Sequence, residues 1–184
     1  MKGEGGREMK IKTLLVFFLL FLLTSAQLLA FDNQRKGFIL GAGFGAGFLS
    51  NEFARITLNK FAIATNFIVG YAPTNSFEIY YLNTVSWWGD DNVTLVTGLT
   101  GIGVTKYFSP EGIGFYVSGG IGLSVHYAPF EVGKASYGLG ILGGIGHDLS
   151  RHWSIQGDVV YIDIKDGFIL KSLGFRVTLN VLAY

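Results

Sequence analysis

The feature that most constrains this chain is a two-residue alternation of large apolar side chains with small ones. The clearest example runs from Gly37 to Phe48, where even positions hold Phe, Leu or Ala and odd positions hold Gly or Ile. Successive side chains of a strand point to opposite faces, so this segment predicts a strand with one bulky face and one nearly bare face. The same pattern recurs in seven more segments, at 61–71, 77–87, 93–108, 115–127, 136–146, 153–161 and 172–181.

The first thirty residues differ from the rest and read as an export signal. Lys10 and Lys12 precede an unbroken apolar run at 14–23, which small residues follow. A positive start, a short apolar run and a small-residue exit are typical of a cleavable secretory signal peptide. The run is too short for a spanning helix, which needs roughly twenty apolar residues. We expect cleavage after Ala30, with Ala26 as the alternative, and a single domain over residues 31–184.

Polar turns separate the predicted strands and set their count. The short stretches 72–76, 109–112 and 148–151 carry Pro, Asn, Asp and Ser, which favour tight turns. The connections near 51–60, 88–92, 128–134 and 163–167 then lie at the opposite end, although 51–60 more simply extends the flanking strands. Eight strands return the chain to the side where it began, as bacterial barrels require. The sequence predicts an all-β, closed, eight-stranded antiparallel up-and-down barrel.

The composition of the two strand faces indicates whether the outer surface of the barrel contacts lipid or water. A soluble barrel keeps apolar side chains inside and a charged face outside. Here one face is bulky and apolar, and the other is largely Gly, Ser, Thr and Asn, which suits a narrow lumen better than a solvated surface. Aromatic residues stand near strand ends, where interfacial girdles require them. They are Phe38, Tyr71, Phe77, Phe108, Phe115, Tyr127 and Trp153. We therefore expect a transmembrane barrel.

Composition also excludes several classes of function. The chain has no Cys, so disulfides, thiolate metal sites and Cys nucleophiles are absent. Residues 31–184 hold ten basic and eleven acidic residues, a net charge of −1, which gives no basic surface for nucleic acid. Glycine-rich runs lie inside strands, without the helix that a phosphate-binding loop needs. No spacing of metal ligands is found, and we expect neither a metal nor a cofactor.

In its strand pattern and in the composition of its two faces, the chain resembles the small eight-stranded bacterial outer-membrane β-barrels of the OmpA/OmpX type. The resemblance covers roughly residues 36–184. Its sharpest element is Ser172 to Leu179, in which Ser172, Gly174, Val177 and Leu179 match the C-terminal assembly signal of that class. The resemblance implies that the outer-membrane insertion machinery reads this strand by β-pairing. Members usually end on a lipid-facing aromatic residue, whereas Tyr184 is out of phase with Val177 and Leu179.

A few inward charges stand out as the candidate site. Glu78, Asp158 and Arg176 fall on the small-residue face, and Asn66 and Gln156 accompany them. Buried charges are costly unless paired, so we expect Arg176 to pair with Asp158 on the adjacent strand and Glu78 to reach this pair across the narrow barrel. The simpler interpretation is a structural plug; the other is a narrow path for small solutes.

Some eight-stranded barrels of the class that this chain resembles are enzymes that modify lipid A. Ser124 and His126 share a face, but a nucleophile, its base and an orienting acid must all be positioned together. The family pattern places its nucleophile where this chain has Ala128. We therefore predict no catalytic residues and no enzyme.

The prediction is a monomeric outer-membrane barrel with a structural or narrow porin-like role. Its expected partners are outer-membrane lipid, lipopolysaccharide and, during assembly, the insertion machinery. A lipid A-modifying enzyme and a secreted soluble ligand-binding barrel remain the alternatives. Loop-mediated adhesion is a further possibility, for which 51–60 offers some apolar content.

Overall fold

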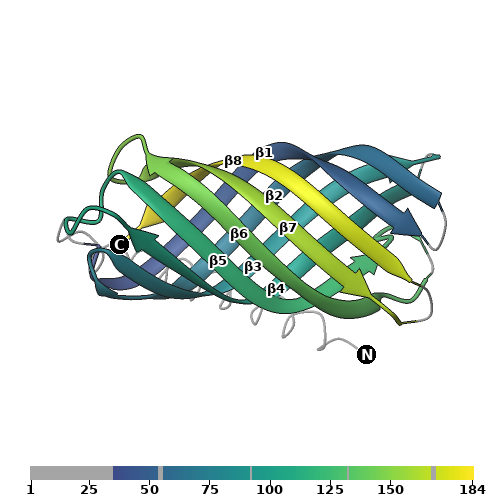
Figure 1. The fold of residues 1–184 in the computed structure, drawn as a ribbon, viewed down its shortest axis with the longest axis horizontal. Helices are drawn as coiled ribbons and strands as arrows, with labels where there is room; N and C mark the ends of the chain where they lie inside the picture. Colours follow the sequence, from purple (N-terminus) through teal and green to yellow (C-terminus); the bar gives the residue numbers. More distant parts are fainter. Residues whose placement is uncertain (1–34, 54–55, 92, 132, 167–168) are drawn as a thin grey trace, which may run out of the picture.

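A computed structural model describes residues 35–53, 56–91, 93–131, 133–166 and 169–184. The signal peptide predicted for residues 1–30 lies outside these ranges. Eight strands form one closed sheet, in which each strand pairs antiparallel with its neighbour in sequence and β8 returns to β1 (Figure 1). This confirms the predicted closed, eight-stranded, antiparallel up-and-down barrel. None of the described residues forms a helix long and apolar enough to cross a membrane.

Six of the eight strands are longer than the sequence pattern suggested; β5 has the predicted bounds and β4 ends one residue earlier. They are β1 Gly37–Phe53, β2 Ile56–Thr74, β3 Phe77–Asp90, β4 Val93–Tyr107, β5 Phe115–Tyr127, β6 Ser136–Asp148, β7 Trp153–Ile164 and β8 Leu170–Ala183. Residues 51–60 lie almost wholly in β1 and β2, which pair up to Phe53 and Ile56, so this segment does extend the flanking strands. A tilted transmembrane strand needs about 9–11 residues, so β1 and β2, with 17 and 19 residues, reach beyond that length.

Three short turns lie at the end of the barrel where β1 begins and β8 ends, which we call the terminal end. They are Asn75–Ser76, 108–114 and 149–152, close to the predicted turns. Gly112 has a φ of +72°, and a Cβ there would lie 1.8 Å from the Asn75 carbonyl oxygen. The β4–β5 turn therefore packs directly on the β2–β3 turn. β1, β3, β5 and β7 end at the opposite end of the barrel, which we call the far end (Figure 1).

The outward positions carry most of the large apolar side chains. Phe44, Ile102 and Phe175 are each more than half exposed, as are many other members of the same alternation. These side chains leave the sheet on its convex side, so the bulky face predicted from the sequence is the outer surface of the barrel.

The interior contains more apolar bulk than the sequence suggested. Leu82, Leu99, Leu142 and Ile162 are buried inside and belong to one cluster with Val160, Ile164 and Leu170. The sequence predicted a lumen filled largely by small and paired polar side chains, and this apolar cluster adds bulk that the prediction did not include. Eight strands enclose a space that must be filled to the density of a protein core, and bare glycine backbone leaves room that only large side chains can fill.

Two glycines show how this filling works. A Cβ on Gly103 would lie 2.3 Å from a ring carbon of Tyr80, and a Cβ on Gly146 would lie 2.2 Å from the ring of Tyr116. Each glycine is the direct partner of its tyrosine on the adjacent strand, so each ring lies flat over the bare backbone of that strand. Inward glycines therefore provide the room that these large inward side chains occupy.

Replacing one of these glycines should destabilise the barrel. We expect Gly103→Ala to lower the free energy of unfolding by about 1–3 kcal/mol, because Tyr80 must move within a filled lumen. Urea unfolding of the barrel in lipid vesicles, followed by tryptophan fluorescence, measures the change. Gly143→Ala is the matched control, since a Cβ there meets no atom within 4 Å. Equal effects of the two substitutions would contradict this account of the lumen.

Candidate functional site

The inward polar side chains gather into two clusters along the barrel axis. The central cluster consists of Thr84, Ser118, Gln156, Asp158 and Arg176, and the terminal cluster consists of Arg35, Glu78, Tyr107, Asp148 and Tyr184. Most of these side chains come from the strands, where they occupy the small-residue face of the alternation; Arg35 and Tyr184 flank β1 and β8.

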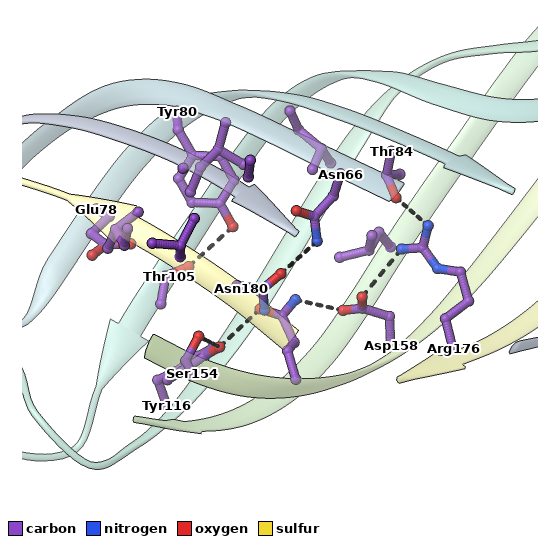
Figure 2. Close-up of a pocket in the computed structure, with 18 of the residues that line it drawn as sticks. Asn66, Glu78, Tyr80, Thr84, Thr105, Tyr116, Ser154, Asp158, Arg176 and Asn180 are labelled. Atoms are coloured by element: carbon purple, nitrogen blue, oxygen red, sulfur yellow. Dashed lines mark hydrogen bonds and ion pairs between the residues drawn. The ribbon is translucent and has the colours of Figure 1, made fainter. Parts of the chain in front are cut away.

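The central cluster is built around one ion pair. Arg176 Nη2 lies 3.1 Å from Asp158 Oδ2, and both side chains are almost completely buried. The second amino group of Arg176 donates to the Thr84 hydroxyl on the other side of the lumen (Figure 2). Gln156 Nε2 donates to the other carboxylate oxygen of Asp158 at 2.6 Å and to Ser118 Oγ at 3.2 Å. The ion pair and its hydrogen-bond partners thus link β3, β5, β7 and β8.

Other polar side chains continue this network toward the terminal end. The Tyr116 hydroxyl lies 3.0 Å from Gln156 Oε1 and 3.1 Å from Ser154 Oγ. Asn66 Nδ2 donates to Asn180 Oδ1 at 2.9 Å, which joins β2 to β8 across β1 (Figure 2). This crossing is possible because Gly43, which lies between them on β1, has no side chain; a Cβ there would lie 1.9 Å from Asn180 Oδ1.

The terminal cluster closes one mouth of the barrel. Arg35 precedes β1 and is 2% exposed; its guanidinium lies 3.0 Å from Glu78 Oε1 and 2.8 Å from Asp148 Oδ2. It also donates to the Tyr107 hydroxyl, and its Cζ lies 4.1 Å from the centre of the Tyr107 ring and 4.9 Å from that of Tyr184. Cation–π contacts of this kind gain strength when they are shielded from water.

The charge of Arg35 is well supported in this position. Burial alone would lower the pKa of the guanidinium, but Tyr107, Glu78 and Asp148 outweigh burial, and the pKa of Arg35 lies above its usual value. One cation faces two carboxylates here, so the terminal mouth depends on Arg35 for most of its positive charge.

Little open space remains between the two clusters. A cavity of about 50 Å³ is lined by side chains of both, including Glu78, Tyr80, Asp158 and Arg176 (Figure 2). That volume has room for about three to five water molecules. The polar groups that line the cavity can bind and orient such water.

The five predicted lumen residues are all inward, but they do not form one cluster. Asp158, Arg176 and Gln156 come together, while Asn66 pairs with Asn180. Glu78 does not reach Arg176; it pairs with Arg35 at the terminal end, because the barrel holds the two levels apart with the Tyr80 and Tyr116 rings between them.

Sequence reasoning missed Arg35, Tyr107, Asp148 and Tyr184. Asp148 was assigned to an exposed turn, and that assignment is wrong because its side chain is buried. Arg35, Asp148 and Tyr184 continue the inward phase of their strands beyond the predicted strand ends, so extending the alternation would have found them. Tyr107 lies within the strand predicted at 93–108, on its inward face.

The residues matching the assembly signal occupy both faces of β8. Ser172 is buried and faces inward with Gly174, whereas Val177 and Leu179 are exposed on the outer surface. Tyr184 is buried at 4% exposure, and its hydroxyl donates to the Arg151 carbonyl. The last aromatic residue therefore closes the terminal mouth and does not face outward.

Ser124 and His126 both lie inside the barrel, toward the far end. Ser124 is fully buried, and its hydroxyl has no hydrogen-bond partner in the described part of the chain, which includes His126. His126 Nδ1 lies 3.0 Å from Thr97 Oγ1, and its ring packs 5.9 Å from that of Trp88. A nucleophile must lie within hydrogen-bond reach of its base, and this pair does not meet that condition. Within the described ranges, no group of three His, Asp or Glu residues comes together as a metal site.

Comparison with solved structures places the fold among known proteins. Ail, the attachment invasion locus protein of Yersinia pestis, solved in complex with the heparin analogue sucrose octasulfate, is 10% identical with a TM-score of 0.55; the match covers 80% of this chain and 99% of that one. Neisserial surface protein A is 17% identical with a TM-score of 0.57, covering 79% and 97%. No family model matches the sequence, and no curated protein matches it.

These similarities establish the fold, which is that of the small outer-membrane β-barrels. They confirm the resemblance to the OmpA/OmpX type that the sequence pattern predicted. At such low identity, the similarity concerns the architecture of the barrel alone.

The central ion pair gives a test of how the lumen is held together. Arg176→Met leaves Asp158 buried without its cation and should cost about 3–5 kcal/mol of unfolding free energy, as should Asp158→Leu. The double variant should recover most of this loss, because no uncompensated charge remains in the lumen. Urea unfolding in lipid vesicles measures all four proteins.

Lys171→Met is the control for the loss of a cation on the same strand. Lys171 is exposed at the far end of β8, so its replacement should change stability by no more than about 0.5 kcal/mol. A double variant as unstable as the sum of the two single variants would contradict the proposed coupling of Arg176 and Asp158.

Proposed function

We propose that this protein is an outer-membrane barrel of a Gram-negative bacterium with a structural role and a lumen closed to solutes. The observation that carries the proposal is the filled interior, where two paired charge clusters leave a cavity of about 50 Å³. An open porin needs a continuous aqueous path, and eight strands enclose too little space for one unless the inward side chains are small. Any conduction would be slow and restricted to water-sized species.

The outer surface supports a place in the membrane. Exposed Phe, Leu, Ile and Val side chains surround the barrel, which in water would form an apolar patch far larger than soluble monomers expose. Aromatic residues mark its two ends: Phe38, Tyr71 and Trp153 near the terminal end, and Phe48 and Phe61 toward the far end. This is the placement of interfacial girdles in outer-membrane barrels.

Orientation and partners follow from the class of barrel that the chain resembles. An even number of strands brings the chain back to the side where it began, which is the periplasmic side in outer-membrane barrels, so the terminal end with Arg35 would face the periplasm and the far end the exterior. The partners would then be outer-membrane lipid and lipopolysaccharide. During assembly the insertion machinery would pair with β8, whose Val177 and Leu179 already point outward.

The two alternatives receive less support from the geometry. A lipid A-modifying enzyme needs a nucleophile open to lipid, whereas Ser124 is enclosed in the lumen. A soluble ligand-binding barrel needs a cavity for its ligand and a polar exterior. The described part of this barrel has a largely filled lumen and an apolar outer surface instead.

Conductance across planar bilayers tests the closed lumen. We expect no discrete openings from the wild type. Arg35→Ala removes the cation from the terminal mouth and leaves Glu78 and Asp148 facing the lumen, so it should give small, cation-selective openings. Discrete conductance in the wild type, equal to that of the variant, would overturn the closed lumen.

The neighbouring Lys36 supplies the control. Its side chain is exposed, and its backbone N–H, which any residue retains, donates to Asn75 Oδ1. Lys36→Ala should therefore remain as silent as the wild type. Openings of the same size from Lys36→Ala and Arg35→Ala would show that surface charge, and not the plug, governs conductance.

A further inference from the structure

The outer surface of the barrel carries one polar region midway along its length. On β1 and on β5 to β8, the outward positions between the two girdles hold only apolar residues or glycine; they lie within 38–48, 115–125, 137–145, 153–161 and 173–181. On β2 to β4 the same face presents Thr65, Asn83 and Thr100. Asn83 follows the exposed Tyr81 by two residues, and Thr100 precedes the exposed Ile102 by two. The polar side chains therefore share the face of those apolar neighbours.

Asn83 and Thr100 lie at the middle of the barrel wall. They are the seventh of 14 residues in β3 and the eighth of 15 in β4, and they are direct partners in the sheet. Asn83 Nδ2 donates to Thr100 Oγ1 at 2.8 Å. If the barrel spans the membrane as proposed above, this pair sits near the centre of the hydrocarbon layer.

The Asn83 amide is only partly satisfied by this contact. A primary amide can donate two hydrogen bonds and accept two. In the described part of the chain, Thr100 is its one side-chain partner, so an N–H and the carbonyl oxygen remain available. Thr65, by contrast, already accepts from Trp87 Nε1 at 3.1 Å. Acyl chains offer no donor or acceptor at this depth, and an unmet amide in hydrocarbon is unfavourable.

We propose that two copies of this protein form a symmetric dimer in the membrane, joined along the outer face of β2–β4 with Asn83 at its centre. Both copies insert in the same direction, so the two-fold axis runs parallel to the membrane normal and residues at equal depth meet. An amide with a free donor and a free acceptor is complementary to itself. Asn83 of each copy can therefore donate to the carbonyl oxygen of the other.

The shape of this face is suited to close approach. Thr65, Asn83 and Thr100 are shorter than the aromatic and aliphatic side chains that flank them on this face. The outward position Gly98 adds no open surface, because the Val85 and Val125 side chains lie over it. Toward the terminal end, a hollow of about 480 Å³ is bordered by Tyr71, Ile79, Tyr81 and Ile102 and gives side chains of the second copy room. Small residues and hydrogen-bonding side chains are the features that hold transmembrane segments together, since lipid competes equally for apolar contacts. This dimer departs from the monomer expected from the sequence.

Single-cysteine cross-linking tests the contact, because the natural chain contains no Cys. Ile102→Cys places a thiol beside Asn83 on the proposed interface, and Ile155→Cys places one on β7, on the opposite side of the barrel. After oxidation in isolated outer membranes, we expect Ile102→Cys to give a disulfide-linked dimer and Ile155→Cys to remain largely monomeric. Equal cross-linking at both positions would overturn the proposal.

The role of the amide is tested by adding Asn83→Leu to the Ile102→Cys chain. Loss of the reciprocal hydrogen bonds should weaken the dimer by about tenfold, judged from the strength of such contacts in membranes. The cross-linked fraction should fall, and the mass of the detergent-solubilised Asn83→Leu protein should shift from dimer to monomer. An unchanged cross-linked fraction would overturn the role of Asn83.

Failure of the dimer can be distinguished from failure of the proposed function. A barrel that fractionates with outer membranes and migrates faster before heating than after it, yet does not cross-link at Ile102→Cys, refutes the dimer alone. A chain found outside the membrane fraction refutes both. Faster migration of unheated Asn83→Leu would confirm that this variant still folds.

Discussion

Closure of eight strands into a barrel leaves an interior so narrow that large inward side chains fit only where a neighbouring strand has no side chain. Inward glycines provide these places: the rings of Tyr80 and Tyr116 lie over Gly103 and Gly146 on the adjacent strands. The same constraint favours closely paired charges, because the small cavity holds too little water to solvate an isolated ion. The filled lumen and its paired charges are therefore two consequences of one geometry.

The paired charges also join parts of the sheet that no backbone ladder connects directly. Arg176 on β8 contacts Thr84 on β3, and Arg35, ahead of β1, contacts Glu78 on β3 and Asp148 on β6. A closed sheet can still shear or flatten, and contacts across its diameter resist both movements. The clusters thus fix the cross-section of the barrel, which neighbouring strand pairs alone would leave adjustable.

Both ends of the described chain meet in the terminal cluster. Arg35 lies against the Tyr184 ring, and the Tyr184 hydroxyl bonds to the Arg151 carbonyl. The β1–β8 pairing is the last to become possible as the barrel closes, because these strands are farthest apart in sequence. A contact between residues flanking those two strands can form only after closure, and it then opposes separation of β1 from β8.

The sequence predicts the fold well and the site only in part, for a physical reason. The alternation at Gly37 to Phe48 and its seven repeats are local signals, so strand number and facing follow directly. Pairing within the lumen depends on the shear of the barrel, which sets the level at which distant strands meet. Asp158 and Arg176 lie on adjacent strands and could be matched, whereas the level of Glu78 could not be deduced, and Arg35 lay outside every predicted strand.

The inner and outer faces of the barrel obey the same rule about polar groups away from water. Inside, strands surround every side chain, so Asn66 finds Asn180 across the bare position Gly43. Outside, Asn83 bonds to one side chain among the described residues, and in the membrane proposed above the lipid would supply no further partner. A polar side chain in the lumen therefore finds its hydrogen-bond partner within the barrel, whereas one on the outer surface needs a partner from a second molecule. On this reasoning, the polar face of β2–β4 marks a protein contact, whereas the lumen polarity serves the barrel itself.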